Sequence, residues 1–241
     1  MNYYYITGTS RGIGKALAIL LLLEDNNYVI GLSRTNTIEH ERYEHLNFDL
    51  SNLEQVENYN FIDILDAEKV VLINNAGMIG DIKNTGNIDN QFIHKTFMVN
   101  TISPAILMNN FLKAYGSLEI EKNIINISSG AGRHPIESWS SYCASKSALD
   151  MFSTVVNKEQ YLINKSNPVK VFSIAPGIVD TQMQDKIREA DKADFSKVDT
   201  FVNYKNNNQL DAPTKTADLL IKIIQNPQKY KEVLLDVRDV L

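Results

Sequence analysis

The sequence predicts an α/β protein whose single domain is a doubly wound parallel sheet with helices on both faces. Short runs rich in β-branched and aromatic residues recur along the 241 residues, and segments long enough for helices separate them. Strands that alternate with helices form right-handed crossovers, which stack into a parallel sheet. The chain has no internal repeats and no Pro- or Gly-rich linkers. We therefore expect one three-layer α/β/α domain over residues 1–241.

Six segments are predicted as strands, namely residues 3–7, 28–32, 69–73, 123–127, 169–174 and 232–237. A weaker strand is predicted at residues 45–48. Because few residues separate it from the strand before it, we expect the helix between them to be short or missing. The charged stretch over residues 180–211 is predicted to be a helical excursion that covers the site as a lid.

Composition and charge narrow the classes of function. The net charge of −5, with both signs interspersed, offers no basic face for a nucleic-acid backbone. Cys143 is the only cysteine, so we expect no disulfide within the chain and no zinc or iron–sulfur site. The longest apolar run, residues 17–23, is far shorter than the roughly 20 residues that span a bilayer. Because strand-like residues begin as early as Asn2, we expect no signal peptide. We expect a cytoplasmic protein without metal, nucleic-acid or membrane partners.

A glycine-rich turn follows the first predicted strand. The segment Thr7-Gly8-Thr9-Ser10-Arg11-Gly12-Ile13-Gly14 leads into a helical stretch over residues 15–23. Glycines in such a turn let the backbone approach a pyrophosphate, whose charge is met by N–H groups and by the positive end of the helix. Glycines also mark ordinary turns, but the strand before and the helix after favour a nucleotide site. The sequence therefore predicts a Rossmann-type fold that binds a dinucleotide here.

The end of the second predicted strand bears on the choice of cofactor. Where an acidic residue would bind the ribose 2′-hydroxyl of NAD, the chain has Ser33-Arg34. Arg34 can meet a 2′-phosphate as a planar fork, and Arg11 can approach the same group, although both could instead be solvated surface charges. Asp49-Leu50 follow the third strand, where side chains pack near an adenine ring, although an Asp in a turn is commonplace. The two arginines favour NADPH over NADH.

Tyr142 is the candidate proton donor, and Lys146 is the candidate residue that adjusts its pKa. A spacing of four residues on a helix places both side chains on one face. Because a nearby ammonium stabilises a phenolate, we expect Lys146 to lower the pKa of Tyr142 from its ordinary value of about 10, which makes the phenol a usable acid and base. The spacing alone is not specific, since Tyr161 and Lys165 repeat it. The context adds Ser129, which follows a predicted strand, where a hydroxyl can donate to a developing alkoxide.

Taken together, these motifs resemble the classical short-chain dehydrogenase/reductase family over essentially the whole chain. The resemblance rests, in chain order, on Gly8, Gly12, Gly14, Asn74-Asn75-Ala76-Gly77, Asn100, Ser129, Tyr142, Lys146, Pro176-Gly177 and Thr181. Asn100 falls in a predicted helical segment, residues 92–107, where an Asn could otherwise lie on the surface or bond back to the helix. Independent motifs in this order do not arise together by chance.

The resemblance implies roles for four catalytic residues. Ser129 would hydrogen-bond the substrate's carbonyl oxygen, and Tyr142 would protonate it as hydride arrives from the nicotinamide. Lys146 would bind the nicotinamide ribose and lower the pKa of Tyr142, while Asn100 would hold a water that links Lys146 to solvent. The implied cofactor site comprises Gly8, Ser10, Arg11, Gly12, Ile13, Gly14, Ser33, Arg34, Asp49, Leu50, Asn75, Ala76, Gly77, Tyr142, Lys146, Pro176, Gly177, Ile178 and Thr181.

Two segments, residues 126–152 and 175–184, resemble the sepiapterin reductases and, still more, the related bacterial benzil reductases. The resemblance implies that Asp180 matches the aspartate that anchors the pterin in sepiapterin reductase. Gln182 stands where those reductases often have an acid, which weakens the case for a pterin. Substrate contacts are expected from Ser129, Trp139, Tyr142, Asp180 and Met183. Trp139 and Met183 could equally be packing residues.

We therefore expect NADPH-dependent reduction of a small ketone or a vicinal diketone. One alternative is an NAD-linked alcohol dehydrogenase working in the oxidising direction, which the lack of an acid at Ser33-Arg34 disfavours. Another is a non-catalytic nucleotide sensor, which would keep the glycine turn but could lose its proton donors. The family resemblance implies a homodimer or homotetramer that packs through the helices containing residues 92–107 and 142–162.

Overall fold

The computed structural model of the chain describes residues 1–240 and confirms a Rossmann-type α/β fold. Seven parallel strands form one sheet in the order β3-β2-β1-β4-β5-β6-β7. The strands are β1 (Asn2–Thr7), β2 (Asn27–Ser33), β3 (Tyr43–Asn47), β4 (Lys69–Asn74), β5 (Glu121–Ile127), β6 (Lys170–Ala175) and β7 (Leu234–Asp236). The chain starts at the centre with β1, builds outward to β3, and resumes on the other side with β4. Ligands bind at the carboxyl ends of the strands where the winding reverses in this way.

Every predicted strand is present, and the last is shorter than predicted. β7 pairs with β6 through three residues only, because the chain then turns into the short 3₁₀ helix η4 (Val237–Val240). The segment between β2 and β3 forms no helix in the described structure, as its short length predicts.

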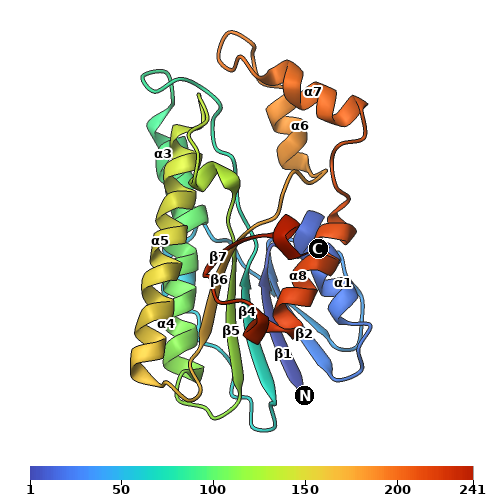
Figure 1. Ribbon diagram of the computed structural model, residues 1–241, viewed down its shortest axis with the longest axis vertical. Helices are drawn as coiled ribbons and strands as arrows, with labels where there is room; N and C mark the ends of the chain where they lie inside the picture. Colours follow the sequence, from blue (N-terminus) through green and yellow to red (C-terminus); the bar gives the residue numbers. More distant parts are fainter. Residues whose placement is uncertain (241) are drawn as a thin grey trace.

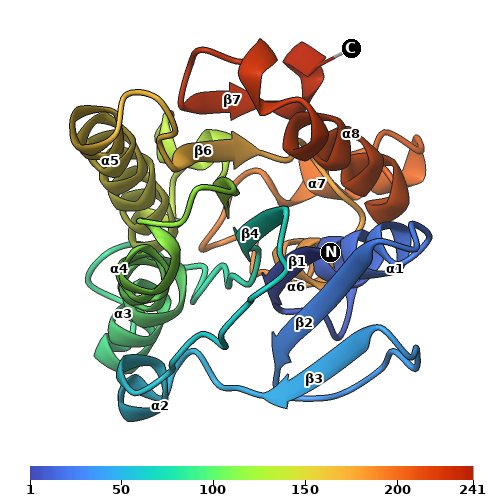
Figure 2. The same ribbon diagram turned by 90° about the horizontal axis from the view of Figure 1, so that it is seen from below.

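Helices cover both faces of the sheet, and Figure 2 shows the three layers end on. On one face lie α1 (Gly12–Leu21) and α8 (Pro213–Gln225). On the other lie α2 (Leu53–Glu57), α3 (Asn90–Phe97), α4 (Ser103–Tyr115) and α5 (Ser140–Ile163). The π-helical turn η1 (Met98–Ile102) joins α3 to α4, and the 3₁₀ turns η2 (Gly130–Gly132) and η3 (Pro227–Lys229) follow β5 and α8. Across residues 1–240, none of the helices combines the length and the apolar character that a membrane crossing requires.

The sheet divides the core into two apolar layers. Along β1, Tyr4 and Ile6 belong to the layer beneath α1 and α8, whereas Tyr5 belongs to the layer beneath α4 and α5. The side chains alternate because successive residues of a strand point to opposite faces. Both faces are buried, which explains why large aromatic or aliphatic residues follow one another at Tyr4, Tyr5 and Ile6. The sheet is thus a packed platform that fixes the strand ends.

Between β6 and α8 the chain leaves the sheet and forms α6 (Gln182–Arg188) and α7 (Val198–Asn206), which stand above the carboxyl ends of the strands (Figure 1). The two ends of this excursion are tied together, because the Asp180 N–H donates to the Asp211 carbonyl at 2.9 Å and the Asp211 N–H donates to the Ile178 carbonyl at 2.9 Å. The helices predicted within residues 180–211 are therefore present. Their action as a lid stays a prediction.

Helix α5 exposes apolar side chains on a segment predicted to meet a second copy of the chain. Met151 is 65% exposed and Val155 is 46% exposed, one turn apart. The homo-oligomer itself stays a prediction.

Candidate active site

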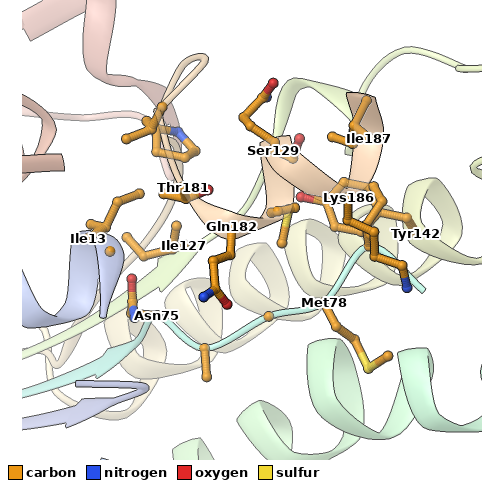
Figure 3. Close-up of a pocket in the computed structure, with 18 of the residues that line it drawn as sticks. Ile13, Asn75, Met78, Ile127, Ser129, Tyr142, Thr181, Gln182, Lys186 and Ile187 are labelled. Atoms are coloured by element: carbon orange, nitrogen blue, oxygen red, sulfur yellow. The ribbon is translucent and has the colours of Figure 1, made fainter. Parts of the chain in front are cut away.

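A cleft of about 1630 Å³ runs along the carboxyl ends of the strands. Figure 3 shows Ile13, next to the glycine turn, at one end of the cleft and Ser129 and Tyr142 at the other. Pockets for a single small ligand measure roughly 300–1,000 Å³, so this larger cleft has room for a dinucleotide together with a second small molecule. Every residue predicted for the site lines the cleft except Gly14 and Asn100.

Three glycines shape the turn between β1 and α1. Gly8 and Gly12 have positive φ angles of 75° and 58°, which residues with a side chain rarely adopt. A Cβ on Gly14 would lie 2.4 Å from the carbonyl oxygen of Gly8. Gly14 therefore allows α1 to pack closely against the turn rather than contributing to the cleft wall. The other two glycines leave a cradle without side chains at the end of the cleft.

The start of α1 fits an anion such as the pyrophosphate of a dinucleotide. Within residues 1–240, no side chain caps α1 at Arg11, and no acidic residue occupies its first turn. The backbone N–H groups of Gly12 and Ile13, which line the cleft, are therefore available to a ligand. The residues present thus fit the dinucleotide predicted from the sequence.

Thr7 and Asn75 hold the glycine turn against the end of β4. The Thr7 hydroxyl accepts hydrogen bonds from the N–H groups of Asn75 and Ala76, both at 3.0 Å. The Asn75 side chain donates to the Thr7 carbonyl at 2.9 Å and to the Gly8 carbonyl at 3.3 Å. Asn75 thus lines the cleft while its amide group maintains the shape of the turn.

Two arginines face the cleft near the end of β2. Arg11 and Arg34 are both exposed and both line the cleft. Ser33 is buried there, and its hydroxyl donates to the Thr35 carbonyl at 3.0 Å. Burial opposes the ionisation of Asp49, but hydrogen bonds from Ser51 and the charge of Arg34 hold the pKa of Asp49 below its usual value. This end of the cleft therefore carries two guanidinium groups, one of them close enough to Asp49 to act on its charge.

Ser129, Tyr142 and Lys146 meet at the opposite end of the cleft. Ser129 follows β5, and its Oγ accepts a hydrogen bond from the Ala131 N–H at 3.1 Å. Tyr142 stands in the first turn of α5, and Lys146 follows one turn later. The Lys146 ammonium donates to the Ile127 carbonyl at 2.7 Å and lies 6.0 Å from the centre of the Tyr142 ring. The side chains predicted to carry the chemistry are thus neighbours.

Burial dominates the acid–base properties of this pair. It raises the pKa of Tyr142 to about 12, against a smaller opposing effect of the hydrogen bond with Ser129. Burial also lowers the pKa of Lys146 to about 8, while the charge of Asp150 acts in the opposite direction. The lowering of the Tyr142 pKa that we expected from Lys146 is therefore not found here. Loss of solvent around the phenol outweighs the effect of an ammonium that is itself directed at a backbone carbonyl.

Asn100 lies behind the cleft, in the π turn η1, and is fully buried. Its Oδ1 accepts from the Met78 N–H at 2.9 Å, and its Nδ2 donates to the Met78 carbonyl at 2.9 Å and to the Ser145 hydroxyl at 3.0 Å. Its Oδ1 and the Lys146 ammonium are both 3.4 Å from the position of a Cβ built on Gly77. Asn100 is thus neither a surface residue nor bonded back to its own helix. It fixes the wall beside Lys146.

An aromatic cluster forms the wall next to Tyr142. The Trp139 ring packs edge-on against Tyr142 at 5.8 Å between centres, and it contacts Phe195 at 5.5 Å and Phe201 at 5.6 Å. Met183 of α6 packs against the same cluster. Trp139 and Met183 therefore pack the base of the excursion and also line the cleft, while their contact with a substrate stays a prediction.

Asp180 lines the cleft, but its carboxylate already has a partner. The Lys205 ammonium of α7 forms an ion pair with the Asp180 carboxylate. Gln182, the first residue of α6, also lines the cleft (Figure 3). Of the two positions where a carboxylate could anchor a pterin, Asp180 is therefore already paired with Lys205, and position 182 carries a glutamine instead of an acid.

Sequence reasoning missed two groups of residues near the site. Lys186 of α6 donates to the Gly80 carbonyl at 2.6 Å, which joins the excursion to the loop after β4. Arg133 and Asp150 form an ion pair of 3.1 Å beside Lys146. The spacing of four residues between Lys146 and Asp150 could have indicated that Asp150 lies beside Lys146 on the helix. Nothing in the sequence connects residues 80 and 186.

Comparisons with known proteins agree with this geometry. The family model described as short chain dehydrogenase matches residues 2–192. The chain is 35% identical to the benzil reductase ((S)-benzoin forming) of Bacillus subtilis strain 168, with 100% of both chains covered. It is 30% identical to the sepiapterin reductase of Xenopus tropicalis, with 74% of each chain covered. The crystal structure of a short chain dehydrogenases/reductase from Saccharomyces cerevisiae is 26% identical, with a TM-score of 0.84 and coverage of 98% of this chain and 96% of the other. The chain therefore belongs to the short chain dehydrogenase family.

Proposed function

We propose that the chain is an NADPH-dependent reductase of ketones and vicinal diketones in which Tyr142 is the proton donor. The observation that carries the proposal is one cleft with a nucleotide cradle at one end and Ser129, Tyr142 and Lys146 at the other. A hydride donor bound along this cleft and a carbonyl next to Tyr142 would share one enclosed space.

The preference for NADPH is supported by Arg11 and Arg34. Both guanidinium groups line the cleft near the end of β2, where an NAD-selective site would offer a carboxylate. A planar guanidinium binds a phosphate through two parallel hydrogen bonds. Asp49 lies near Arg34, but its carboxylate accepts hydrogen bonds from the Ser51 N–H at 2.9 Å and the Ser51 hydroxyl at 2.8 Å. The Asp49 carboxylate is thereby bound to the turn that contains it, and we do not expect it to bind the ribose of a cofactor.

The residues of the chain supply the proton and the positioning, and bound NADPH supplies the hydride. The Ser129 Oγ accepts from the Ala131 N–H, and its hydroxyl, which hydrogen-bonds Tyr142 in the free chain, would donate to the oxygen of a bound carbonyl. Tyr142 then gives its proton to that oxygen. Because burial raises the pKa of Tyr142 to about 12, the phenol holds this proton at neutral pH.

Among carbonyl substrates, the site favours aryl diketones such as benzil over pterins. The wall beside Tyr142 is built from Trp139 and Phe201, which suit a flat apolar group. Asp180 is paired with Lys205, so a pterin would have to displace an ammonium to reach that carboxylate. A full-length relative named benzil reductase supports the same choice.

Initial rates of NADPH consumption test the proposal. Benzil, sepiapterin and simple ketones are offered to the purified chain, with NADPH and NADH in parallel. We expect turnover of benzil with NADPH, at a higher kcat/KM than with NADH or with sepiapterin. NADPH binding without turnover of any carbonyl would favour the sensor, and oxidation of alcohols with NAD in place of reduction would favour the dehydrogenase.

A further inference from the structure

A buried carboxylate lies one helical turn beyond Lys146. Asp150 follows Lys146 by four residues and Tyr142 by eight, and such a spacing places all three on one face of α5. All three are buried, and Asp150 is only 5% exposed. The proposed chemistry uses Tyr142 as the proton donor with Lys146 beside it, and it assigns nothing to Asp150.

The Asp150 carboxylate is held rigidly from both sides. Arg133 donates from Nε to one carboxylate oxygen at 3.1 Å, and the Ser173 hydroxyl donates to the other at 2.6 Å. The remaining nitrogens of Arg133 donate to the carbonyls of Ser173 and Leu235 at 3.2 and 3.1 Å. Arg133 thereby joins the turn after Ser129 to α5, β6 and β7. The carboxylate cannot change its orientation without losing these bonds.

The other groups around the Lys146 ammonium are neutral and offer little compensation for its charge. They are the Ile127 carbonyl, which accepts at 2.7 Å, the Tyr142 phenol, the Asn100 amide and Gly77. Burying an ammonium in such surroundings disfavours the charged form. Asp150 is the charge that opposes this effect, since burial lowers the pKa of Lys146 to about 8 and Asp150 raises it.

We propose that Asp150 is a positioning residue that keeps the buried Lys146 protonated, and that Arg133 limits how strongly the negative charge of Asp150 acts on Lys146. The charged groups in this chain of contacts are Lys146 and Asp150 of α5 and Arg133 after η2. Farther out lies Asp236 of β7, whose pKa is lowered chiefly by its hydrogen bonds with Arg238 and to a smaller extent by the charge of Arg133. The consequence for catalysis rests on the proposed reductase. The protonation of Lys146 is a property of the chain alone.

The electrostatics predict opposite signs for two substitutions. Asp150→Asn keeps the shape of the side chain and removes the negative charge, so the pKa of Lys146 should fall. Arg133→Gln removes the positive charge that partly neutralises Asp150, so the pKa of Lys146 should rise. Damage to the packing of α5 would not separate the two variants in this way. Ser173→Ala is the matched control, because it removes one hydrogen bond to Asp150 and no charge.

NMR titration of lysine labelled with ¹³C at Cε measures the pKa of Lys146 directly, with the signal assigned through a Lys146→Arg variant. We expect the pKa to fall by about 1 in Asp150→Asn, to rise in Arg133→Gln, and to stay within about 0.3 of the original value in Ser173→Ala. An unchanged pKa in Asp150→Asn, or shifts of the same sign in both charge variants, would overturn the inference. If Asp150→Asn does not fold, Arg133→Gln decides alone, since a rise supports the inference and no change or a fall refutes it.

The pH profile of benzil reduction then links the pair to catalysis. As the pH rises, Lys146 loses its proton and the rate should fall, so the alkaline limb of kcat/KM should move to lower pH in Asp150→Asn and to higher pH in Arg133→Gln. A purely structural role would reduce kcat/KM without moving the limb. The NMR titration needs no turnover. If the chain reduces no carbonyl, the proposed function is contradicted, but the titration still measures the effect of Asp150 and Arg133 on the pKa of Lys146.

Discussion

At the scale of single residues, Arg34 is the side chain on which cofactor choice depends. It is exposed at the end of β2 and lines the cleft, and its charge acts on Asp49. A dianionic phosphate bound in the cleft can accept two parallel hydrogen bonds from this guanidinium. NADH has no phosphate at this position, so Arg34 should contribute little to its binding.

Replacing Arg34 by Ala should therefore raise the Kd of NADPH by about 10- to 100-fold and leave the Kd of NADH nearly unchanged. Arg34→Lys, which keeps the charge and loses the planar fork, should fall between the original chain and Arg34→Ala. Fluorescence titration measures the Kd of NADPH and of NADH for the original chain and for both variants. Equal losses for NADPH and NADH would show that Arg34 does not contact the 2′-phosphate.

The residues of the candidate site were predictable from spacing, but their protonation was not. The spacing of four placed Tyr142 and Lys146 on one face of a helix, and the structure brings them together. The expected fall in the pKa of Tyr142 was wrong because burial cannot be read from spacing, and burial raises that pKa to about 12. Asp150 was missed because its partner Arg133 belongs to a loop seventeen residues earlier in the chain.

At the scale of elements, the glycine turn shows how closely α1 must approach β1 and β4. A Cβ on Gly14 would lie 2.3 Å from the Asn75 side-chain nitrogen and 2.4 Å from the Gly8 carbonyl oxygen. Asn75 cannot yield without losing its bonds to Thr7 and Gly8, which hold the cradle. The turn, the helix start and the end of β4 therefore form one packed unit.

Gly14→Ala should destabilise the chain by about 1–3 kcal/mol, although Ala is the better helix former, because the added methyl group forces α1 away from the turn. In a chain of this size the loss corresponds to a fall in Tm of roughly 2–12 °C. Gly130→Ala is the matched control, since a Cβ there meets nothing within 4 Å. Differential scanning calorimetry compares the two variants, and equal Tm values would refute the account of the turn.

Elements of the fold were predictable to different degrees. The predicted strands are present because buried parallel strands contain uninterrupted apolar runs, as in residues 70–73 of β4. The helical segment predicted over residues 92–107 proved to be α3, the π turn η1 and the start of α4. A π-helical turn has one residue more than an α-helical turn, and apolar periodicity does not reveal it. This turn directs Asn100 inward to Met78 and Ser145.

At the scale of the whole molecule, the strand order assembles the site from distant parts of the chain. The cradle follows β1, Ser129 follows β5, and Thr181 follows β6, yet a Cβ on Gly12 would touch the Thr181 side chain at 3.4 Å. This order places the nucleotide end of the cleft where the winding reverses and the chemistry beside α5. The alternation of strands and helices predicted a parallel sheet, but only the family resemblance predicted which strand ends would meet.

The central claim is that Tyr142 donates the proton in carbonyl reduction, and replacing it by Phe tests this most directly. Tyr161→Phe is the matched control, because Tyr161 lies on the same helix and its side chain is partly exposed. Initial rates with NADPH and benzil, together with the Kd of NADPH, are measured for both variants. We predict that Tyr142→Phe loses at least about 1,000-fold in kcat/KM with NADPH binding intact, while Tyr161→Phe keeps full activity. Retained activity in Tyr142→Phe would contradict the account.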